Sequence, residues 1–348
     1  MSFRVYEETL NEAQEEALAM LKSTRSASVT SARFDWLYRQ NPDGPAVLWS
    51  IRNGETGEMA GFTVGLPRRI VVDGKVQRCW NGADFSIHPK FRTLGIALKL
   101  RRAAKEAVDA GRVDFLYAHP NSQMQLIHER VGHQPVGTMM RFTKLLRTER
   151  YLKRSPLTRW LPNIASGFAD SILRFTGREW RHRASVSTSF VAGIQFDKRF
   201  DGLFEEAASI RPVVGVRDAQ YLNWRYSQNP LYKTDAILAE QGTRLVGYAV
   251  FAVDGNVVHL KDLFAVGDKA VLRDLTAALI QHCRTLWVDC ISAVALDGNP
   301  ILPVLKEFGF MHRLEGSEMF GYVSNNSPLA SRVLKRDHWF LTVGDRDV

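Results

Sequence analysis

The sequence predicts an α/β (α+β) protein in which one fold unit occurs twice along the chain. The first observation is an internal repeat, because the pattern Trp-x-Tyr-x-Gln-Asn-Pro stands at 36–42 and again at 224–230. The second is a pair of apolar segments joined by a turn after each copy, which is typical of a strand hairpin. The third is a helical segment that closes on a glycine late in each half. The spacing of roughly 180–190 residues predicts a tandem duplication, since solenoid repeats are much shorter.

Local patterns predict the elements of each half in order. An acidic, amphipathic segment near the start indicates a helix, and alternating or continuous apolar runs bounded by turn residues indicate strands. In the first half we expect a helix at 8–23, strands at 47–51, 59–64, 83–87 and 113–118, and helices at 98–110 and 122–131. In the second half we expect strands at 236–240, 245–250 and 291–296, and a helix at 300–308.

Charge and repeat together predict the domain organisation. We expect an N-terminal domain at 1–140, a basic amphipathic linker at 141–195, a C-terminal domain at 196–325 and a tail at 326–348. Between 141 and 183, eleven Lys or Arg stand against three acids, which accounts for nearly all of the formal net charge of +9. Two alternatives remain for the linker. It is either a pair of helices that lies on an anionic membrane surface, or a segment whose apolar side covers the contact between the two domains while its arginine side chains extend into water.

Composition narrows the class of protein. No apolar run is long enough to cross a bilayer, and the acidic first twenty residues lack the pattern of a signal peptide. The three cysteines are odd in number and lack metal-ligand spacing, so we expect reduced thiols in a cytoplasmic protein and no metal. In the tail, the aromatic pair Trp339 and Phe340 predicts docking onto a domain, because free terminal segments fray.

A strand-to-helix turn at 88–97 carries the main functional signal. Here Arg92-x-x-Gly95-x-Ala97 follows the strand at 83–87 and precedes the helix at 98–110. A helix start presents unpaired backbone N–H groups and partial positive charge, and a glycine lets an anion approach them. The spacing differs from that of a P-loop and from that of a dinucleotide-binding loop. The turn therefore indicates a site for a phosphate or diphosphate.

This turn resembles the acyl-CoA diphosphate signature of the GNAT acyltransferase superfamily. The resemblance covers about 31–140 and 195–322 and implies two tandem GNAT folds, each a mixed, mostly antiparallel sheet flanked by helices. The Trp-x-Tyr-x-x-Asn-Pro pattern looks like that of acyltransferases encoded with bacterial polysaccharide genes. Acetyl-CoA, or another acyl-CoA, is the implied co-substrate. The implied binding residues are Phe85, Ser86, Ile87, Arg92, Thr93, Leu94, Gly95, Ile96, Ala97 and Asn121.

The second half departs from the signature at the corresponding turn, 260–272. It has one glycine there, and Asp262 and Asp268 would repel a diphosphate. We therefore expect a single acyl-CoA site, in the N-terminal half, with the C-terminal half shaping the acceptor cleft.

Three sets of residues are candidates for proton transfer. Asp84 lies on the strand that leads to the turn and is a candidate base, with a hydrogen-bonding carboxylate as the alternative. His128 takes the position of a tyrosine acid in the resembling family, or is structural. Asp345 and Asp347 are further candidates if the tail folds into the cleft. The aromatic residues of the two repeat copies either stack on a sugar or, as we favour, pack in the core.

The expected function is N-acetyl transfer from acetyl-CoA to an amino sugar or polysaccharide precursor, by direct attack of the amine on the thioester. The alternative is a sensor that uses the scaffold and the basic linker to bind an anionic ligand, a nucleotide or a membrane. An aminoacyl-tRNA-dependent transferase is disfavoured, because the acyl-CoA turn would then have no role. The expected partners are a small-molecule or glycan-precursor acceptor and an anionic membrane touched through 141–183; we expect no specific nucleic acid.

Overall fold

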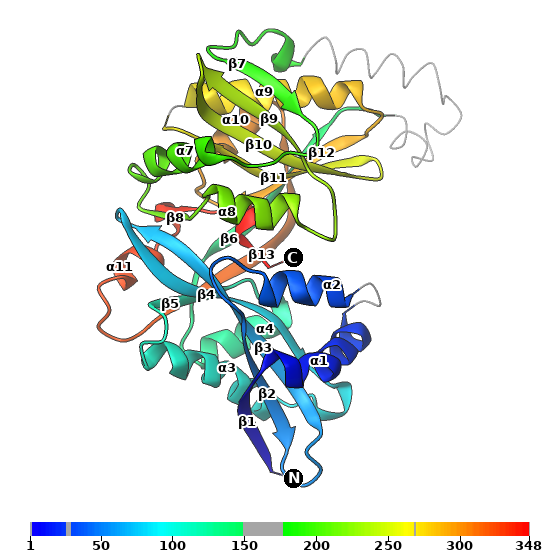
Figure 1. The fold of residues 1–348 in the computed structure, drawn as a ribbon, viewed down its shortest axis with the longest axis vertical. Helices are drawn as coiled ribbons and strands as arrows, with labels where there is room; N and C mark the ends of the chain where they lie inside the picture. The colour runs from blue at the N-terminus through cyan, green and yellow to red at the C-terminus, as the bar shows by residue number, and fades with distance from the viewer. Residues whose placement is uncertain (1, 26–28, 149–176, 268, 348) are drawn as a thin grey trace.

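The computed structural model describes residues 2–25, 29–148, 177–267 and 269–347. The middle of the predicted linker, 149–176, lies outside the described residues. The described strands form one sheet of fourteen strands with helices on both faces (Figure 1). Most neighbouring strands are antiparallel, and only the β4–β5, β11–β12 and β8–β14 pairs are parallel. The predicted fold class, a mixed and mostly antiparallel sheet flanked by helices, is confirmed.

The two halves repeat one order of elements. The first half contains β1 Phe3–Glu8, α1 Leu10–Thr24, α2 Ser31–Phe34, a π-helical turn Asp35–Arg39, β2 Val47–Asn53, β3 Met59–Val72, β4 Lys75–Ile87, a 3-10 turn Pro89–Phe91, α3 Leu94–Asp109, β5 Phe115–Ala118, α4 Ser122–Arg130 and β6 Gln134–Leu145. The second half contains a 3-10 turn Arg178–Trp180, β7 Ser187–Val191, α7 Lys198–Ala208, β8 Val213–Gly215, α8 Ala219–Leu222, a π-helical turn Asn223–Ser227, β9 Asp235–Gln241, β10 Arg244–Asp254, β11 Val257–Ala265, α9 Lys269–Thr285, β12 Cys290–Leu296, α10 Ile301–Glu307 and β13 Met311–Val323. The closing elements are α11 Ala330–Val333, a 3-10 turn Arg336–His338, β14 Trp339–Phe340 and a 3-10 turn Val343–Asp345.

The halves exchange strands at the centre of the sheet. The order is β1-β2-β3-β4-β5-β13-β6-β12-β11-β10-β9-β7, so β13 of the second half lies between β5 and β6 of the first. In return, β6 lies between β12 and β13, pairing Met139 with Leu296 and with Ser317. Each half is therefore completed by a strand of the other. Strand β6 runs through the predicted boundary at 140, and β7, which lies in the predicted linker, pairs with β9 of the second half.

Two tryptophans of the repeated pattern meet where the halves face each other. Trp36 Nε1 donates to the carbonyl oxygen of Trp224 at 2.8 Å, and Trp224 Nε1 donates to the carbonyl oxygen of Trp36 at 2.8 Å. Their rings stack with centroids 5.2 Å apart, and both side chains are buried. These aromatic residues therefore pack in the core and do not face a sugar site.

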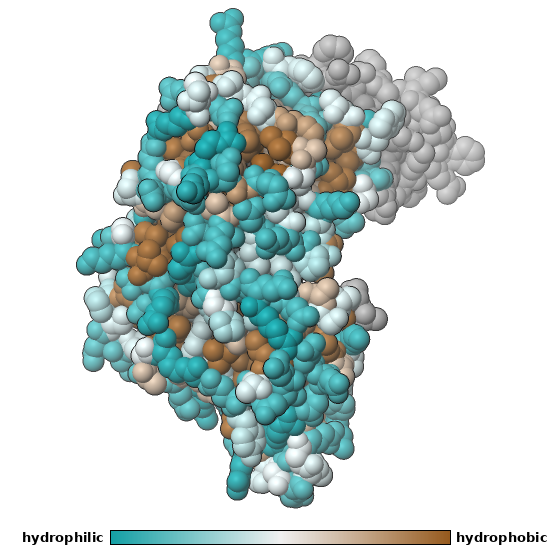
Figure 2. All heavy atoms as spheres, in the orientation of Figure 1, coloured by the Kyte–Doolittle hydropathy of each residue, from teal (hydrophilic) through white to brown (hydrophobic). Residues whose placement is uncertain are grey.

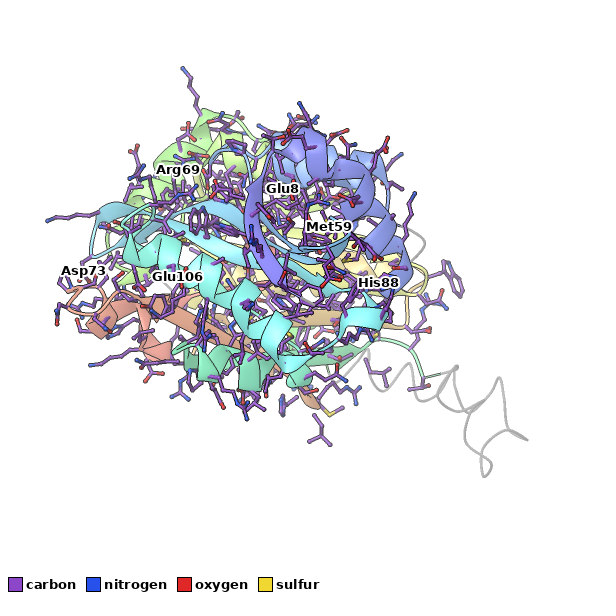
Figure 3. The ribbon with its side chains drawn as sticks, turned by 90° about the horizontal axis from the view of Figure 1, so that it is seen from below. Glu8, Met59, Arg69, Asp73, His88 and Glu106 are labelled. Atoms are coloured by element: carbon purple, nitrogen blue, oxygen red, sulfur yellow. The ribbon has the colours of Figure 1, made fainter. Side chains whose placement is uncertain are left out.

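Helices cover the two faces of the N-terminal half separately. Figure 3 shows α1 on one side of the strands and α3 on the other, with α3 running between the regions of His88 and Glu106. Thr93 caps α3, its hydroxyl accepting from the Ile96 amide, so the helix begins at Leu94 and not at the expected residue 98. Gly95 thus lies in the first turn of the helix. Strand β1 was not expected, although its alternation of exposure fits an edge strand.

Residues 339–345, here called the closing segment, dock onto the sheet as the aromatic pair predicted. Trp339 and Phe340 pair in parallel with β8. The Leu341 carbonyl oxygen then accepts from the Leu296 amide at 3.0 Å and from the Asn299 side chain at 2.9 Å. In the part of the chain that the structure describes, no helix combines the length and the apolar character needed to cross a bilayer. Figure 2 shows a largely hydrophilic surface that is hollowed between the two lobes, at the right edge of the view.

Candidate active site

The larger cavity of the N-terminal half, about 690 Å³ in volume, lies at the turn that the sequence singled out. It is built by the end of α1, the end of β4, the start of α3, the β5–α4 connection and the last described residues. The lining residues are Thr24, Arg25, Phe85, Ser86, Ile87, Arg92, Thr93, Leu94, Ala97, His119, Asn121, Gln123, Met124, Ile127, Arg346 and Asp347. Eight of the ten expected cofactor-binding residues are among them, and Gly95 and Ile96 are not.

A bulge in β4 opens one edge of that strand to the cavity. Phe62 of β3 pairs with Ser86 while Val64 pairs with Ala83, so two residues of β4, Asp84 and Phe85, stand opposite one. Asp84 has a φ of 44°, in the left-handed region. Pairing of β4 with β5 ends at Gly82 and Ala118, so beyond the bulge β4 is paired with β3 only.

The direction of the free edge follows from one hydrogen bond. The His88 amide donates to the carbonyl oxygen of Ala60, on the β3 side. Backbone groups of successive strand residues point to opposite sides, so the N–H and C=O of Ile87 point away from β3 and into the cavity. The Arg92 side chain also lies on that side, since its Nε donates to the Ile87 carbonyl oxygen at 3.3 Å.

The start of α3 supplies further donors to the same cavity. Thr93 satisfies the amides of Ile96 and Ala97, through its hydroxyl and its carbonyl oxygen. The amides of Leu94 and Gly95 then have no partner among the described residues, as expected for a helix start. A Cβ added at Gly95 would meet nothing within 4 Å, so there is open space in front of these amides. Exposed Arg92 adds positive charge at the same place.

Asp84 is fully buried beneath the bulge and bound by three side chains. Its carboxylate accepts from Arg33 at 2.9 and 3.2 Å, from the Tyr38 hydroxyl at 2.5 Å, and pairs with Arg25 at 2.7 Å. Burial acts to raise the pKa of Asp84, but the charges of Arg33 and Arg25 outweigh it and hold that pKa below its ordinary value. Asp84 lines only a smaller neighbouring cavity of about 80 Å³. These contacts favour the hydrogen-bonding alternative over a role as base.

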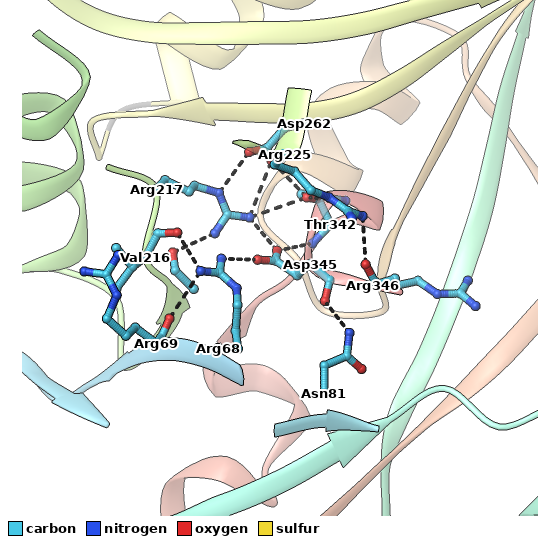
Figure 4. A network of polar contacts seen from close by, with 12 residues as sticks. Arg68, Arg69, Asn81, Val216, Arg217, Arg225, Asp262, Thr342, Asp345 and Arg346 are labelled. Carbon is cyan, nitrogen blue, oxygen red and sulfur yellow. Dashed lines mark hydrogen bonds and ion pairs between the residues drawn. The ribbon is translucent and has the colours of Figure 1, made fainter. Parts of the chain in front are cut away.

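The other two expected catalytic residues also lie off the larger cavity. His128 is buried in α4, with its Nδ1 3.1 Å from Nδ1 of His133. Burial lowers the pKa of His128 well below its ordinary value, and Arg101 adds to this effect. Asp345 is buried in a network in which Arg68 donates to it at 3.0 Å and Arg217 bridges it to Asp262 (Figure 4). Burial acts to raise the pKa of Asp345, but the charges of Arg217 and Arg68 outweigh this effect, so that pKa lies below its ordinary value.

His119 lines both the larger cavity and the neighbouring cavity of about 80 Å³, and it was not expected from the sequence. It follows β5 directly, and both ring nitrogens are buried without a hydrogen-bond partner among the described residues. Burial holds the pKa of His119 well below its ordinary value, with a smaller effect of Arg346, so the ring is neutral near pH 7. The sequence feature that could have indicated a role for His119 is its position directly after a strand and two residues before the expected Asn121.

Asp347 lines the same two cavities, as the sequence allowed if the tail folded into the cleft. Burial raises the pKa of Asp347 above its ordinary value, and the charge of Asp84 raises it further, against the effect of Arg346. The larger cavity therefore holds a neutral imidazole and a carboxyl group that retains a proton more readily than usual.

The corresponding place in the C-terminal half is filled by the closing segment. Pairing of β11 with β12 ends at Leu260 and Ala293, just as β4 and β5 separate in the first half. Thr342 forms an antiparallel bridge with Ala295, and Phe340 packs edge-on against Phe264 with ring centroids 5.3 Å apart. Asn299, which corresponds in order to Asn121, binds the Leu341 carbonyl oxygen.

Solved structures that match this fold include two N-acetyltransferases and an N-myristoyltransferase. A GCN5-related N-acetyltransferase from Anabaena variabilis matches with a TM-score of 0.68 at 13% identity, over 93% of this chain and 73% of that one. A GCN5-related N-acetyltransferase from Kribbella flavida matches with a TM-score of 0.62 at 16% identity, over 92% and 71%. N-myristoyltransferase from Saccharomyces cerevisiae, solved with bound myristoyl-CoA, matches with a TM-score of 0.59 at 13% identity, over 92% and 82%. Neither a protein-family model nor any curated protein sequence matches the chain. At these identities the likeness establishes the GNAT fold.

Proposed function

We propose that this protein is an acyl-CoA-dependent N-acyltransferase that acetylates the amine of an amino sugar or polysaccharide precursor. The observation that carries the proposal is one cavity in which the unpaired edge of β4 meets the open start of α3. The edge at Ile87 can pair with an extended amide-bearing arm as an added strand would. The amides of Leu94 and Gly95, with Arg92, suit the diphosphate of the same co-substrate.

The side chains at the cavity account for the protons of the reaction. Bound acyl-CoA supplies an activated acyl group as a thioester. The acceptor nitrogen forms a bond to the acyl carbon, the carbon–sulfur bond breaks, and the amine loses a proton while the thiolate gains one. His119 receives the amine proton at a ring nitrogen, because its imidazole is neutral and neither nitrogen has a hydrogen-bond partner in the described part of the chain. Asp347 lines the same cavity, and burial raises its pKa above the ordinary value, which makes it a better proton donor to the thiolate than an ordinary aspartate.

The identity of the acceptor rests on the resemblance of the repeated Trp-x-Tyr-x-x-Asn-Pro pattern to acyltransferases of polysaccharide gene clusters. The three cysteines are buried free thiols, which supports the expected reducing, cytoplasmic compartment. The sensor alternative and peripheral membrane contact depend on the linker cations, and Arg150, Lys153 and Arg154 lie outside the described residues. No described contact favours that alternative over the enzyme.

The test is isothermal titration of the protein with acetyl-CoA, comparing wild type with Gly95→Glu. Glutamate in the first turn suits a helix start, so the fold is retained, while its charge repels a diphosphate. We expect the substitution to weaken binding by roughly tenfold or more, since two like charges about 4 Å apart near a surface interact by several kcal/mol.

Gly202→Glu is the matched control, because Gly202 also lies in a helix and a Cβ there would meet nothing within 4 Å. It should bind acetyl-CoA like wild type. Longer acyl-CoAs, titrated in parallel, report the preferred chain length. Absence of heat with every acyl-CoA tested would overturn the proposal.

A further inference from the structure

The guanidinium of Arg101, in α3, is buried without a partner. Arg101 is only 2% exposed, and its Nε atom has no hydrogen-bond partner among the described residues. No carboxylate in the described part of the chain lowers the cost of burying this charge, and burial alone lowers the pKa of Arg101 to about 10. The group is therefore still charged at pH 7. A buried charge without a partner is costly, so an anion supplied by a ligand would be bound favourably there.

The terminal nitrogens of Arg101 lie at the point where β4 and β5 separate. A Cβ added at Gly82 would come within 3.0 Å of Nη1 and 3.5 Å of Nη2 of Arg101. Gly82 and Ala118 form the last pair between the two strands. The absence of a side chain at Gly82 thus leaves room for the guanidinium. At this place Arg101 lines the neighbouring cavity of about 80 Å³, here called the inner cavity.

The inner cavity adjoins the larger cavity on the side away from the start of α3. Residues 85–87 of β4 line the larger cavity, whereas residues 82–85 line the inner one, and His119 and Asp347 line both. In the proposed acyl-CoA complex the diphosphate lies at the start of α3 and the arm lies along Ile87. The thioester is at the far end of that arm. The acyl group that it carries is therefore directed along β4 into the inner cavity.

The carboxylates that line the inner cavity have other cations beside them. Asp84 pairs with Arg33 at 2.9 Å and with Arg25 at 2.7 Å. Asp347 has a pKa raised by burial, so it is charged less readily than usual, and the charge of Arg346 acts on it. These two carboxylates thus face three arginines even before the buried guanidinium of α3 is counted. The inner cavity therefore has positive charge that the described carboxylates do not balance.

We propose that the inner cavity binds a carboxylate at the end of the acyl group, so that the protein also transfers a short dicarboxylic acyl group from coenzyme A. Arg101 is the ligand, because a guanidinium donates two parallel hydrogen bonds to a carboxylate. The inference rests on the proposed acyl-CoA site and goes beyond it by adding a class of acyl donor. The carbon–sulfur bond breaks and the carbon–nitrogen bond forms as for acetyl, and the terminal carboxylate is unchanged. The small volume of the inner cavity restricts the acyl chain to a few atoms.

The experiment is a calorimetric titration of the full chain with two pairs of acyl-CoAs that are matched in shape. Malonyl-CoA is compared with isovaleryl-CoA, in which two methyl groups replace the two carboxylate oxygens. Succinyl-CoA and 4-methylpentanoyl-CoA form a second pair that is one methylene longer. In at least one pair we expect wild type to bind the dicarboxylic member about tenfold more tightly or better, because a buried, hydrogen-bonded pair of charges forms only with that member.

Variants at Arg101 separate recognition from a structural role. Arg101→Met should bind the two members of each pair alike, whereas Arg101→Lys, which keeps the charge, should retain part of the preference. The matched control is Arg102→Met, which changes the next, exposed arginine of α3 and should behave like wild type. Arg101→Met should also melt no lower than wild type, because it removes a buried charge that has no partner. A lower melting temperature would mean that the protein itself supplies a partner, and would overturn the inference.

The remaining outcomes distinguish this inference from the proposed function. Heat with acetyl-CoA but equal affinities within both pairs in wild type overturns the dicarboxylic inference alone, and needs no variant. A preference that Arg101→Met retains in full overturns it as well. Absence of heat with every acyl-CoA overturns the proposed function instead.

Discussion

His119 differs from His128 in what its ring can do. The Nδ1 atom of His128 is 3.1 Å from that of His133, whereas neither nitrogen of His119 has a partner among the described residues. Leaving a buried polar atom unpaired is costly, so such an atom in a cavity is a candidate to bind a ligand. The sequence pointed to His128 because of its spacing from Gly132. Such a spacing does not indicate whether the ring nitrogens have hydrogen-bond partners in the folded protein.

We expect His119→Gln to reduce kcat by about 10²–10⁴-fold, because it removes the group that accepts the amine proton. Binding of acetyl-CoA, measured by calorimetry, should change little, and His312→Gln, at an exposed histidine, should be as active as wild type. The neutral imidazole is the active form, so kcat/KM should fall as pH decreases. Because burial lowers the pKa of His119 below the ordinary value of 6.5, this fall should occur below pH 6.5. An unchanged kcat in the variant would assign the proton transfer elsewhere.

Asp84 and Asp73 allow a buried ion pair to be compared with an exposed one at the same backbone conformation. Both aspartates have left-handed backbones, with φ values of 44° and 45°. Asp84 is buried against Arg33 and Arg25, whereas Asp73 pairs with Arg332 at the surface, where both side chains are nearly half exposed. Asparagine tolerates this backbone region, so the two substitutions differ mainly in the charges they leave unpaired.

We expect Asp84→Asn to lower the free energy of unfolding by about 3–5 kcal/mol, because it removes the carboxylate charge that pairs with the buried Arg33 guanidinium. Asp73→Asn should cost less than ~1 kcal/mol. Urea unfolding at pH 7 measures both. The folded-state pKa of Asp84 lies below its ordinary value of 3.8, so its stabilisation is present above that value and is lost as pH falls through the lower folded-state pKa. Equal losses in the two variants would show that the buried ion pairs of Asp84 contribute no more than the surface pair of Asp73.

The elements around the cavity were predictable to different degrees. The strand, turn and helix from 83 to 109 follow local patterns, and the capping threonine explains the earlier start of α3. The full length of β3 and the first part of β4 were not expected. Pro67, Arg68 and Arg69 interrupt the pattern of apolar residues in β3, and β4 begins with polar residues, so neither segment shows the pattern of a strand. Asp347 reaches the cavity from far along the chain, and no local pattern predicts such a contact. The assignment of Asp84, His128 and Asp345 as catalytic residues stays a prediction, and all three lie outside the lining of the larger cavity.

Two truncations should separate the structural and catalytic parts of the final residues. Removal of 346–348 takes Arg346 and Asp347 from the cavity but leaves the buried closing segment in place. We expect a melting temperature within a few degrees of wild type and a turnover reduced by at least about tenfold. Removal of 339–348 also uncovers the Trp339 and Leu341 sites and should unfold the protein, since each large buried side chain contributes about 2–5 kcal/mol. Differential scanning calorimetry and an acetyl-transfer assay report the two effects.

The two halves share an order of elements but present different clefts. In the first half the gap between β4 and β5 is the proposed co-substrate site, and in the second the gap between β11 and β12 contains Leu341 and Thr342. The tandem duplication stays a prediction, because an order of elements does not establish descent. What the sequence could not predict is the strand exchange, since pairing between distant strands leaves no local signature.

Calorimetry should therefore give one acetyl-CoA per chain. The closing segment already makes, with β12 and Asn299, the backbone contacts that an added ligand would need in the second half. In Gly95→Glu all of the binding should weaken together, so that no fraction of it keeps the wild-type affinity. A ratio of two per chain, or a second class of sites that keeps the wild-type affinity in the variant, would contradict a single site.

The exchanged strands also set the timing of folding during synthesis. Strand β5 ends at residue 118, but its neighbour β13 comprises residues 311–323. At ribosomal speeds of about 5–20 residues per second, the nascent first half waits roughly 10–40 s with an open strand edge. An edge left open for that long invites pairing with other chains. We therefore expect the newly made polypeptide to need chaperone protection until the last hundred residues emerge, and its yield to depend on translation rate.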